Sequence, residues 1–366
     1  MNAVSSAQVN SSAAPGLDRG GPAQPLLAVK NLVKHFPVRE GMGLGPKRAV
    51  HAVDGVSFEV AKGETLGIVG ESGCGKSTTA RLIARLLPAD AGSLVFDGDG
   101  VDEFGGLSLR DYRRNLQMVF QDSFASLNPR MTMEDTISFA PRVHGVSADL
   151  ARQRAHALLD RVGMLPAQFA SRYPHELSGG QRQRVNIARA LALEPRLVIL
   201  DEAVAALDKS VQAQVLNLLQ ELKSEQGLTY IFISHDLHVV QYLCERVMVM
   251  YLGQVVEIGP VEQIYAAPRH PYTRALLSAV PSMDPARRVA HVVLAGDPPN
   301  PINPLPGCRF RERCPRAHAV CESRAPALHE LPDTGHQAAC HMLVPGSGHP
   351  EAPPAIAAHA ADEVIA

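Results

Sequence analysis

The pattern of apolar and polar positions predicts a domain in which helices cover a parallel sheet. The apolar runs at Val198–Leu200 and Tyr230–Ile233 are continuous rather than alternating, as in parallel strands buried on both faces. From Gly70 to about Tyr265, such runs alternate with helix-like segments. Before them, "LLAVKNLVKHF" and "AVDGVSFEVAKGETLGIVG" have the composition of strands separated by turn residues. We therefore expect an α/β core preceded by antiparallel strands.

Changes in composition divide the chain further. The segment Met133–Leu165 has helical periodicity and few strand formers, which predicts a helical subdomain at about 126–184 inserted into the core. Residues near both ends are rich in Ala, Pro, Gly and Ser or His, a composition typical of disorder. The predicted parts are a disordered lead at 1–25, the main domain at 26–265, a small Pro-rich extension at 266–344 and a disordered tail at 345–366.

Composition and charge exclude several classes of protein. The 366 residues carry a net charge of −2, so we expect no nucleic-acid partner, which would need a basic surface. No apolar run approaches the roughly 20 residues of a membrane-spanning helix. The N-terminus lacks the basic and apolar regions of a secretory signal, so we expect a cytosolic protein.

A glycine-rich loop predicts a phosphate-binding site. The stretch "GESGCGKST" fits G-x-x-x-x-G-K-[ST] between the expected strand Thr65–Val69 and an amphipathic helix, the context that this motif requires. Backbone N–H groups and the helix N-terminus would surround the phosphates, Lys76 would reach the β- and γ-phosphates, and the Ser77 hydroxyl would bind Mg²⁺. The predicted ATP-binding residues of the loop are Gly70, Glu71, Ser72, Gly73, Cys74, Gly75, Lys76, Ser77 and Thr78.

Two acids follow the strand "RLVIL". Asp201 would lie at the carboxyl edge of the sheet, where ligands of α/β proteins bind, and we expect it to hold Mg²⁺. Glu202 lies one residue further, so its side chain would face the attacking water as general base. The alternative is a pair of acids at a helix N-terminus.

The stretch "ELSGGQRQR" carries a family resemblance. Together with the loop and the acids it resembles the ATP-binding subunits of ABC transporters, over about residues 26–265. The resemblance implies a P-loop NTPase of ABC type: a RecA-like core with a mixed sheet, an antiparallel β subdomain and an inserted α-helical subdomain. It also implies a head-to-tail pair with a second homologous ATPase subunit. In such a pair the signature of each subunit contacts the other's ATP; here those residues are Leu177, Ser178, Gly179, Gly180 and Gln181.

The resemblance implies further roles by position. Gln121 in "MVFQD" matches the glutamine that touches Mg²⁺, and His235 in "FISHD" matches the histidine that contacts the γ-phosphate. Phe36 matches the aromatic that stacks on adenine, and Asp208 matches the aspartate of the D-loop. Ala205 stands where that loop usually has serine, which removes one hydroxyl. The implied catalytic residues are Glu202, His235 and Lys76, and Mg²⁺ would be held by Ser77, Gln121 and Asp201.

The C-terminal extension indicates which group of ABC transporters the chain resembles most. "HPYTRALLSAVPSMDP" and "GDPPNPINPLPGCRFRERCP" resemble the C-terminal extension of oligopeptide/dipeptide importer ATPases, and most of all the F-type subunit of dipeptide importers. This implies an ATPase that drives peptide uptake from the cytoplasmic face of the cell inner membrane, as a peripheral subunit. Its partners would be two permease subunits and a periplasmic or extracellular solute-binding protein. Nickel, glutathione, heme or an oligosaccharide remain alternative solutes.

Other classes of ABC protein are also open. A non-transport ATPase of DNA repair or translation would usually show two cassettes or a long coiled-coil insertion, neither of which is seen here. A regulatory module that binds but does not hydrolyse nucleotide would lack the base or the histidine, and both are present.

Four of the six cysteines lie in the extension: Cys308, Cys314, Cys321 and Cys340. Their spacing matches neither a zinc ribbon nor a ferredoxin run, so the residues alone leave Zn²⁺, an iron–sulfur cluster and unligated thiols open. The resemblance favours a [4Fe–4S] cluster that holds the extension folded. We expect nearby arginines to offset the charge of the thiolates and nearby histidines to be substitute ligands: Arg309, Arg311, Arg313 and Arg316, and His318, His336 and His341.

Overall fold

The structure is a computed structural model that describes residues 21, 23–38, 48–102, 106–280, 300–332 and 335–354. Most of the predicted N-terminal lead therefore lies outside the described residues. So does part of the Pro-rich connector before the cysteines.

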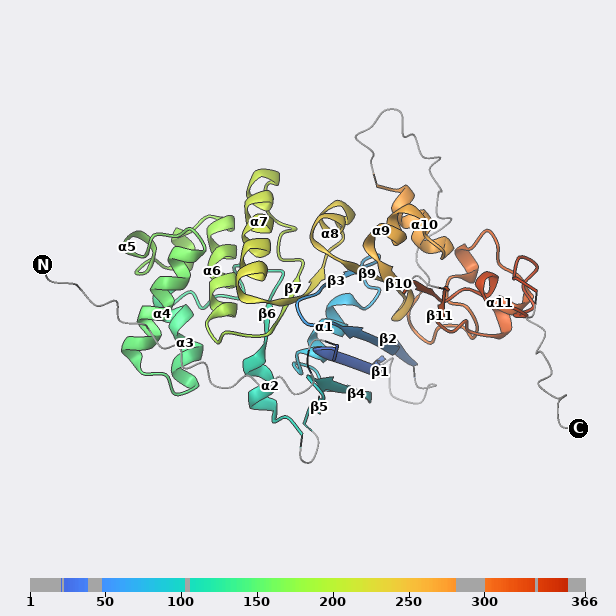
Figure 1. Cartoon of the computed structure of the whole chain (residues 1–366), viewed down its shortest axis with the longest axis horizontal. Coiled ribbons are helices and arrows are strands. Elements are labelled where there is room, and N and C mark those ends of the chain that lie inside the picture. The colour runs from blue at the N-terminus through green and yellow to red at the C-terminus, as the bar shows by residue number, and fades with distance from the viewer. Residues whose placement is uncertain are drawn as a thin grey trace, which may run out of the picture.

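One large sheet forms the centre of the molecule (Figure 1). Its strand order is β11-β12-β10-β9-β3-β8-β7-β6, and the five strands from β9 to β6 run parallel. The expected parallel sheet is thus present, with antiparallel strands added at one end, so that the sheet is mixed. The strands are β3 (Thr65–Val69), β6 (Leu116–Val119), β7 (Leu197–Asp201), β8 (Thr229–Ile233), β9 (Arg246–Tyr251), β10 (Gln254–Pro260), β11 (His329–Glu330) and β12 (Gln337–Ala338).

The central strands are buried on both faces, which explains their continuous apolar runs. Alternate residues of β7 face opposite cores: Val198 and Leu200 belong to one hydrophobic cluster, whereas Leu197 and Ile199 belong to the other. The strand extends one residue beyond the predicted apolar run at each end. Leu197 pairs with Thr229 of β8 at its start, and Asp201 pairs with Ile233 of β8 at its end. This pairing fixes Asp201 at the carboxyl edge of the sheet.

Helices cover both faces of this sheet and connect its strands (Figure 1). Their caps follow from the sequence: Asp236 accepts N–H groups at the start of α8, and Gly227 ends α7 in a left-handed conformation. The helices outside the helical subdomain are α1 (Lys76–Ile83), α2 (Leu109–Asn115), α7 (Lys209–Gln226), α8 (Leu237–Leu243), α9 (Val261–Ala266) and α10 (Pro271–Ser278).

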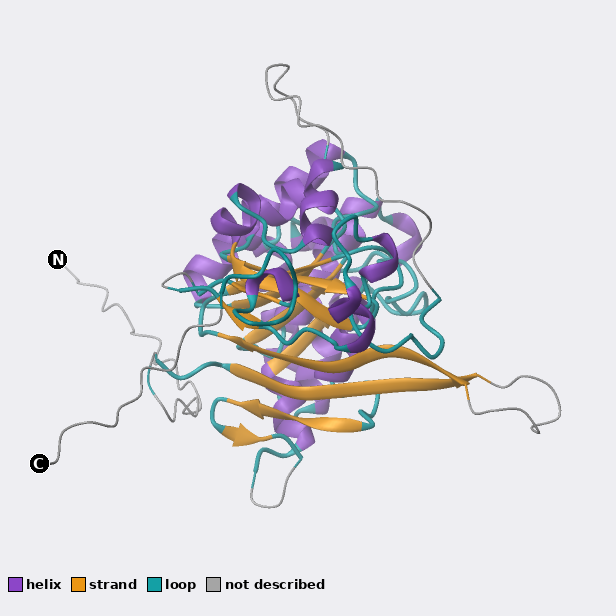
Figure 2. Cartoon of the chain, turned by 90° about the vertical axis from the view of Figure 1, so that its right-hand side faces the viewer, coloured by secondary structure: helices purple, strands orange, loops and turns teal. Residues whose placement is uncertain are grey.

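A separate antiparallel sheet packs below the core, as Figure 2 shows. Its order is β2-β1-β4-β5, and its first two strands form a long hairpin. This sheet is the predicted antiparallel unit, and it brings β2 next to the glycine-rich loop, where Ala52 contacts Gly75. The strands are β1 (Leu27–Val38), β2 (Arg48–Val60), β4 (Ala91–Phe96) and β5 (Asp99–Gly100).

A group of helices projects from the β6 and β7 end of the sheet (Figure 1). Ser and Thr side chains cap three of them: Thr132, Ser147 and Ser178 each accept an N–H group of the first turn. The last helix continues beyond the predicted end of the subdomain near residue 184. The elements are α3 (Met133–Val143), α4 (Ala148–Arg161), α5 (Pro166–Phe169), η1 (Pro174–Glu176) and α6 (Gly179–Leu191).

The C-terminal extension joins the core sheet rather than standing apart from it. Its strand β12 pairs with β10 through Glu257 and Ile258. The other elements of the extension are η2 (Arg311–Arg313), α11 (Ala319–Ser323) and η3 (His341–Leu343). The prediction that disorder begins at 345 is wrong for residues 345–354, because Ser347 and His349 are buried against the cysteine region. Hydrogen bonds of Ser347 to the His341 carbonyl and of His349 to the Arg316 carbonyl hold this segment.

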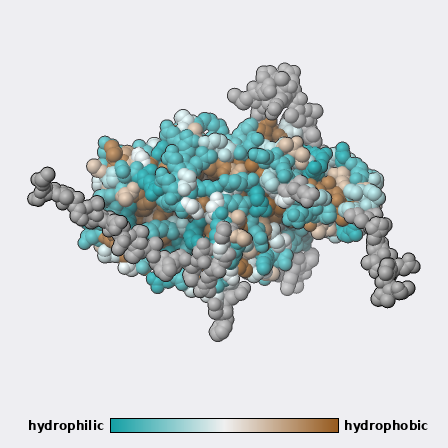
Figure 3. All heavy atoms as spheres, in the orientation of Figure 1, coloured by the Kyte–Doolittle hydropathy of each residue, from teal (hydrophilic) through white to brown (hydrophobic). Residues whose placement is uncertain are grey.

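The surface in Figure 3 is mainly hydrophilic, with hydrophobic residues in small patches. Four exposed large apolar residues lie in the helical group, namely Phe139, Val143, Leu150 and Leu165. In the part of the chain that the structure describes, no helix has the length and apolar character needed to cross a lipid bilayer.

Candidate functional site

The glycine-rich loop connects β3 to α1, as predicted. Gly75 caps the helix with φ 108°, and a Cβ atom there would lie 2.2 Å from the Ala52 carbonyl oxygen, so only glycine fits. The buried Lys76 ammonium donates hydrogen bonds to two carbonyls of its own loop, Gly70 at 2.7 Å and Glu71 at 3.0 Å. These carbonyls hold the ammonium inside the loop.

A cavity of about 340 Å³ opens beside this loop. It brings the loop together with predicted residues from three other places in the chain: Gln121, Glu202 and His235. Its remaining lining includes one residue that the sequence did not indicate, Ala52 of β2. The lining residues are Ala52, Ser72, Gly73, Gly75, Lys76, Ser77, Thr78, Gln121, Glu202 and His235.

Asp201 and Ser77 meet at the inner end of this cavity. The Ser77 hydroxyl donates a hydrogen bond of 2.8 Å to the Asp201 carboxylate. Burial raises the pKa of Asp201, and the nearby Glu202 charge adds to this effect, whereas the Ser77 hydrogen bond opposes it. A buried carboxylate paired with a hydroxyl supplies the oxygen donors that Mg²⁺ prefers.

Glu202 is held in an unusual backbone conformation. Its φ is 48°, in the left-handed region, and its N–H donates to the Ile233 carbonyl at 3.0 Å. This turn directs the carboxylate toward two predicted partners. Glu202 Oε2 accepts a hydrogen bond of 2.9 Å from the Gln121 amide and lies 3.5 Å from His235 Nδ1. The strained turn thus places a carboxylate, an amide and an imidazole at one edge of the cavity.

The remaining predicted nucleotide residues lie away from this cavity. Phe36 on β1 is 37% exposed, and the Lys34 ammonium lies 5.6 Å from its ring centre. Asp208 is the N-cap residue of α7. In the signature, Ser178 and Gln181 cap the start of α6 reciprocally: the Ser178 hydroxyl accepts the Gln181 N–H, and the Gln181 amide oxygen accepts the Ser178 N–H.

The four cysteines of the extension line one cavity. Burial raises the pKa of Cys308 to about 11 and that of Cys340 to about 12, and it also raises that of Cys314. Among the described residues, no three of the sulfur atoms lie within 4.8 Å of one another. A single tetrahedral Zn²⁺ bound at 2.3 Å would need sulfur atoms roughly 3.8 Å apart. The arrangement is therefore wider than a mononuclear zinc site.

The charged residues near the quartet divide into two groups. Arg311, Arg316 and His341 line the cysteine cavity, and the Arg316 charge opposes the rise that burial causes in the pKa of Cys314, although Arg316 also pairs with Glu351. The prediction is wrong for Arg309 and Arg313, which pair with Asp54 and Glu71. The Arg311 guanidinium donates to backbone carbonyls. His336 bonds to Glu257, and His318 packs edge-on against His349; neither lines the cysteine cavity. His341 does line it, but its Nε2 bonds to the Arg324 carbonyl.

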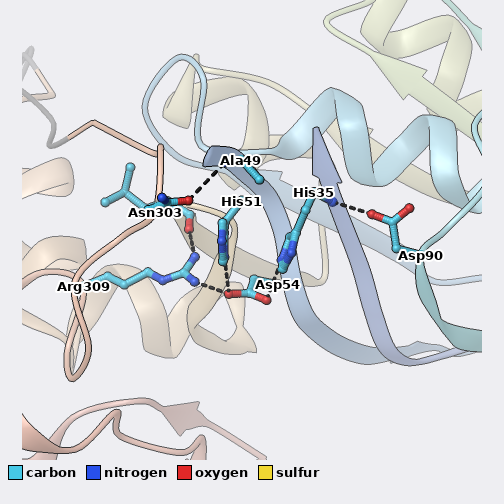
Figure 4. Close-up of polar contacts among 8 residues, drawn as sticks. His35, Ala49, His51, Asp54, Asp90, Asn303 and Arg309 are labelled. Carbon is cyan, nitrogen blue, oxygen red and sulfur yellow. Dashed lines mark hydrogen bonds and ion pairs between the residues drawn. The ribbon is translucent and has the colours of Figure 1, made fainter. Parts of the chain in front are cut away.

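A second polar cluster lies beneath the β1–β2 hairpin (Figure 4). His35 Nε2 and His51 Nδ1 lie 2.9 and 3.2 Å from the two oxygens of Asp54, and the two rings stack with centres 3.8 Å apart. The Arg309 guanidinium approaches the same carboxylate from the extension. These three ligand atoms are close enough for a metal, but the arginine already balances the only carboxylate. The cluster is thus a structural junction between hairpin and extension.

Comparison with known proteins agrees with this arrangement. Residues 53–205 match the family model for ABC transporters, and residues 256–321 match the model for the oligopeptide/dipeptide transporter C-terminal region. A probable peptide ABC transporter ATP-binding protein of Sinorhizobium fredii is 49% identical over 93% of this chain and 96% of its own length. The chain belongs to the ATP-binding subunits of ABC transporters.

Two further relatives support this family and its fold. The oligopeptide transport ATP-binding protein AppF of Bacillus subtilis is 48% identical over 87% of this chain and 98% of its own length. A solved dimer of an ATP-binding cassette, in a post-hydrolysis state with ADP and phosphate, has a TM-score of 0.54 and 28% identity. The match covers 64% of this chain and 98% of the solved chain. The predicted ABC-type P-loop fold and the ATPase class are confirmed.

Proposed function

We propose that the chain is the ATP-hydrolysing subunit of an ABC importer of peptides, and that it drives uptake across the cytoplasmic membrane. The observation that carries this proposal is the convergence of Lys76, Glu202 and His235 on one cavity beside the glycine-rich loop. The match of the extension to the oligopeptide/dipeptide transporter region supports peptides as the solute.

In the proposed reaction, ATP occupies the cavity beside the loop. Lys76 would exchange its loop carbonyls for the β- and γ-phosphate oxygens, and Phe36 would stack on the adenine. Ser77, Gln121 and Asp201 would hold Mg²⁺, which neutralises phosphate charge. Glu202 would take the proton of the attacking water, and His235 would contact the γ-phosphate. The hydrogen bond from the Gln121 amide to the Glu202 carboxylate would link the metal ligand to the base.

The signature needs a partner. Ser178, Gly179 and Gly180 form a helix start that does not line the nucleotide cavity of its own chain. A helix N-terminus with exposed N–H groups suits a phosphate. We therefore propose that Leu177–Gln181 close over the ATP of a second homologous subunit, and that Asp208 of the D-loop lies at this interface.

The exposed apolar residues of the helical group suit a membrane-bound partner. Phe139 and Val143 are 57% and 59% exposed, and Phe124 in the segment after Gln121 is 51% exposed. Apolar side chains grouped on a charged surface mark interaction sites. We propose that this face docks two permease subunits at the cytoplasmic side of the membrane, with a solute-binding protein on the far side. Replacing Val143 with Asp should then abolish co-purification with the permeases, whereas replacing the equally exposed Leu305 should not.

The solute is tested by uptake. A strain that lacks this subunit should lose uptake of labelled di- and tripeptides and regain it with the wild-type gene. A glutamine in place of Glu202 should not restore uptake. Loss of nickel, glutathione, heme or oligosaccharide uptake with peptide uptake intact would assign the subunit to that solute instead.

For the cysteine quartet we propose a [4Fe–4S] cluster held by Cys308, Cys314, Cys321 and Cys340. All four thiols line one cavity, and four cysteine thiolates are the usual ligands of such a cluster, which supports the proposal. The cluster would supply a structural crosslink between segments that have little core of their own. Anaerobically purified protein should contain about four irons per chain with absorbance near 400 nm, and stoichiometric zinc would contradict the proposal.

A further inference from the structure

The loop between Cys308 and Cys314 contacts the nucleotide-binding part of the chain at two points. Arg309 reaches Asp54 beneath the hairpin, as Figure 4 shows. Arg313 reaches Glu71 with two parallel hydrogen bonds of 2.9 and 3.1 Å. Both arginines stand directly beside a cysteine of the quartet, so the ends of this loop are the cysteines themselves.

Arg313 and Glu71 form a shielded pair with fixed geometry. The Arg313 side chain is only 6% exposed, and the Glu71 side chain is 25% exposed. Tyr251 lies on the other side of the guanidinium, with its ring centre 6.0 Å away. A bidentate arginine–carboxylate contact restrains orientation as well as distance.

Glu71 belongs to the phosphate loop, which makes this pair relevant to nucleotide binding. Its carbonyl accepts a hydrogen bond from the Lys76 ammonium at 3.0 Å, and its N–H donates to the Tyr272 hydroxyl at 2.9 Å. The Glu71 side chain does not line the nucleotide cavity. Arg313 and Tyr272 hold Glu71 through its carboxylate and its N–H group, and neither of them lines this cavity.

Contacts inside the extension connect the Arg313–Glu71 pair to the cysteines. Phe310, buried between the two arginines, packs against the rings of Tyr251, Tyr272 and His270 at 5.3 to 5.6 Å. The Cys308 N–H donates to the Cys321 carbonyl at 2.7 Å, which ties the start of the loop to α11. A group bound by all four thiolates would fix both ends of the loop that presents Arg313.

We propose that Arg313 is a positioning residue of the phosphate loop, and that loading of the cysteine quartet strengthens ATP binding through the Arg313–Glu71 contact. This inference rests on the proposed ATPase function and on a metal group in the quartet. Coupling between two sites is reciprocal: a bound group that favours the loop conformation in which Arg313 holds Glu71 raises the affinity for ATP when ATP binds that conformation more tightly.

The first test compares Arg313→Ala, Arg313→Lys and the control Arg152→Ala, whose arginine pairs with Glu134 in the helical group. Affinity for a fluorescent N-methylanthraniloyl ATP is measured together with KM and kcat. Arg313→Ala should weaken ATP binding and raise KM by roughly 10- to 100-fold, with kcat at saturating ATP within about twofold of wild type. Arg313→Lys keeps the charge but not the two parallel hydrogen bonds, so its KM should lie between those of wild type and Arg313→Ala, and Arg152→Ala should match wild type.

The second test is a double-mutant cycle of Arg313→Ala with Cys321→Ser, read out as ATP affinity and, independently, as metal content. Cys321→Ser should lower both metal content and ATP affinity. In the Arg313→Ala background, Cys321→Ser should lower metal content but leave ATP affinity unchanged, because the Arg313–Glu71 contact that couples the two sites is absent. If Arg313→Ala fails to fold, Glu71→Gln replaces it in the same cycle, since it weakens the same pair from the other side.

The outcomes separate this inference from the proposed function. Unchanged ATP affinity in Arg313→Ala and Glu71→Gln would overturn the positioning role. Additive losses in the cycle would overturn the coupling to the quartet. Wild-type protein that neither binds nor hydrolyses ATP would refute the proposed function itself, and the inference with it.

Discussion

The side-chain amide of Gln121 donates a hydrogen bond to the carboxylate of Glu202 across 2.9 Å, although the two residues are 81 positions apart in the sequence. Gln121 follows β6 and leads into the helical group, whereas Glu202 follows β7 in the core. A movement of the helical group relative to the core would therefore change the environment of the proposed base. This contact offers a direct route from subunit docking to hydrolysis.

Replacing Glu202 with glutamine should stop hydrolysis without abolishing nucleotide binding. The amide keeps the size and one acceptor of the carboxylate but cannot take a proton, so kcat should fall by roughly 10²- to 10⁴-fold. ATP affinity should stay within a few-fold of wild type, and ATP should then accumulate in a dimer visible by size-exclusion chromatography. Glu176→Gln, at an exposed glutamate before the signature, is a matched control. Hydrolysis at the wild-type rate in Glu202→Gln would remove Glu202 from the mechanism.

Alanine substitutions in the phosphate loop should separate backbone strain from steric clash. Gly73 and Gly75 both have positive φ, but a Cβ at Gly73 meets nothing within 4 Å, whereas one at Gly75 lies 2.2 Å from the Ala52 carbonyl oxygen. Gly73→Ala should cost about 1 kcal/mol of unfolding free energy from backbone strain alone. Gly75→Ala should displace the loop from β2 and lower ATP affinity at least tenfold, as measured by calorimetry. Equal effects of the two substitutions would contradict the clash.

The sequence predicted those parts of the site whose geometry is local. A strand, a glycine-rich loop and a helix are contiguous, so the position of Lys76 could be predicted from its neighbours. The same holds for Asp201, because an acid that ends a buried strand must lie at the sheet edge. The family resemblance was needed for Gln121 and His235, since nothing in their own surroundings indicates that both approach Glu202.

Contacts made across long distances in the sequence could not be predicted. Arginines beside cysteines suggested neutralisation of thiolates, yet Arg309 and Arg313 pair with Asp54 and Glu71, more than 240 positions away. An arginine pairs with whichever carboxylate the fold brings within reach, and composition does not specify which. The tail was misjudged for a similar reason: Ser347 and His349 are polar, but carbonyls of the extension satisfy them when they are buried.

Removing the Phe36 ring should weaken ATP binding if it stacks on adenine. Stacking of a base on an aromatic side chain contributes about 1–3 kcal/mol, so Phe36→Ala should raise KM for ATP by roughly 5- to 100-fold with little change in kcat. Tyr242→Ala is the control, because this aromatic is also exposed and its hydroxyl hydrogen-bonds to Asn217 and Gln220 of α7. Affinities for ATP and GTP should fall to a similar extent, because stacking on an aromatic ring accepts either base. Wild-type KM in Phe36→Ala would assign the adenine contact to another residue.

Glu257 should make the attachment of the extension dependent on pH. This fully buried carboxylate of β10 accepts the N–H groups of Arg269 and His270 at 2.6 and 2.9 Å, and it lies 2.6 Å from His336 Nε2. Burial acts to raise the pKa of Glu257, but hydrogen bonds from His336 and from the Arg269 and His270 N–H groups outweigh it and hold the pKa below its usual value of 4.5. Burial also lowers the pKa of the His270 ring to about 4, so this ring is neutral at pH 7.

A lowered carboxyl pKa stabilises the fold at a pH above 4.5, and this stabilisation is lost as the pH falls through the folded-state value. The amide of Glu257→Gln has one acceptor oxygen where the carboxylate has two. The variant should therefore be about 1–3 kcal/mol less stable to unfolding than wild type at pH 7. Urea unfolding at pH 7 and pH 3.5 should show this difference shrinking at the lower pH, because the unfolded wild-type chain binds a proton at Glu257 below pH 4.5 and the carboxylate then stabilises the fold less. Glu262→Gln, at an exposed position of α9, should show no difference at either pH. A Glu257→Gln deficit that is the same at both pH values would mean that Glu257 stabilises the extension through its shape and not its charge.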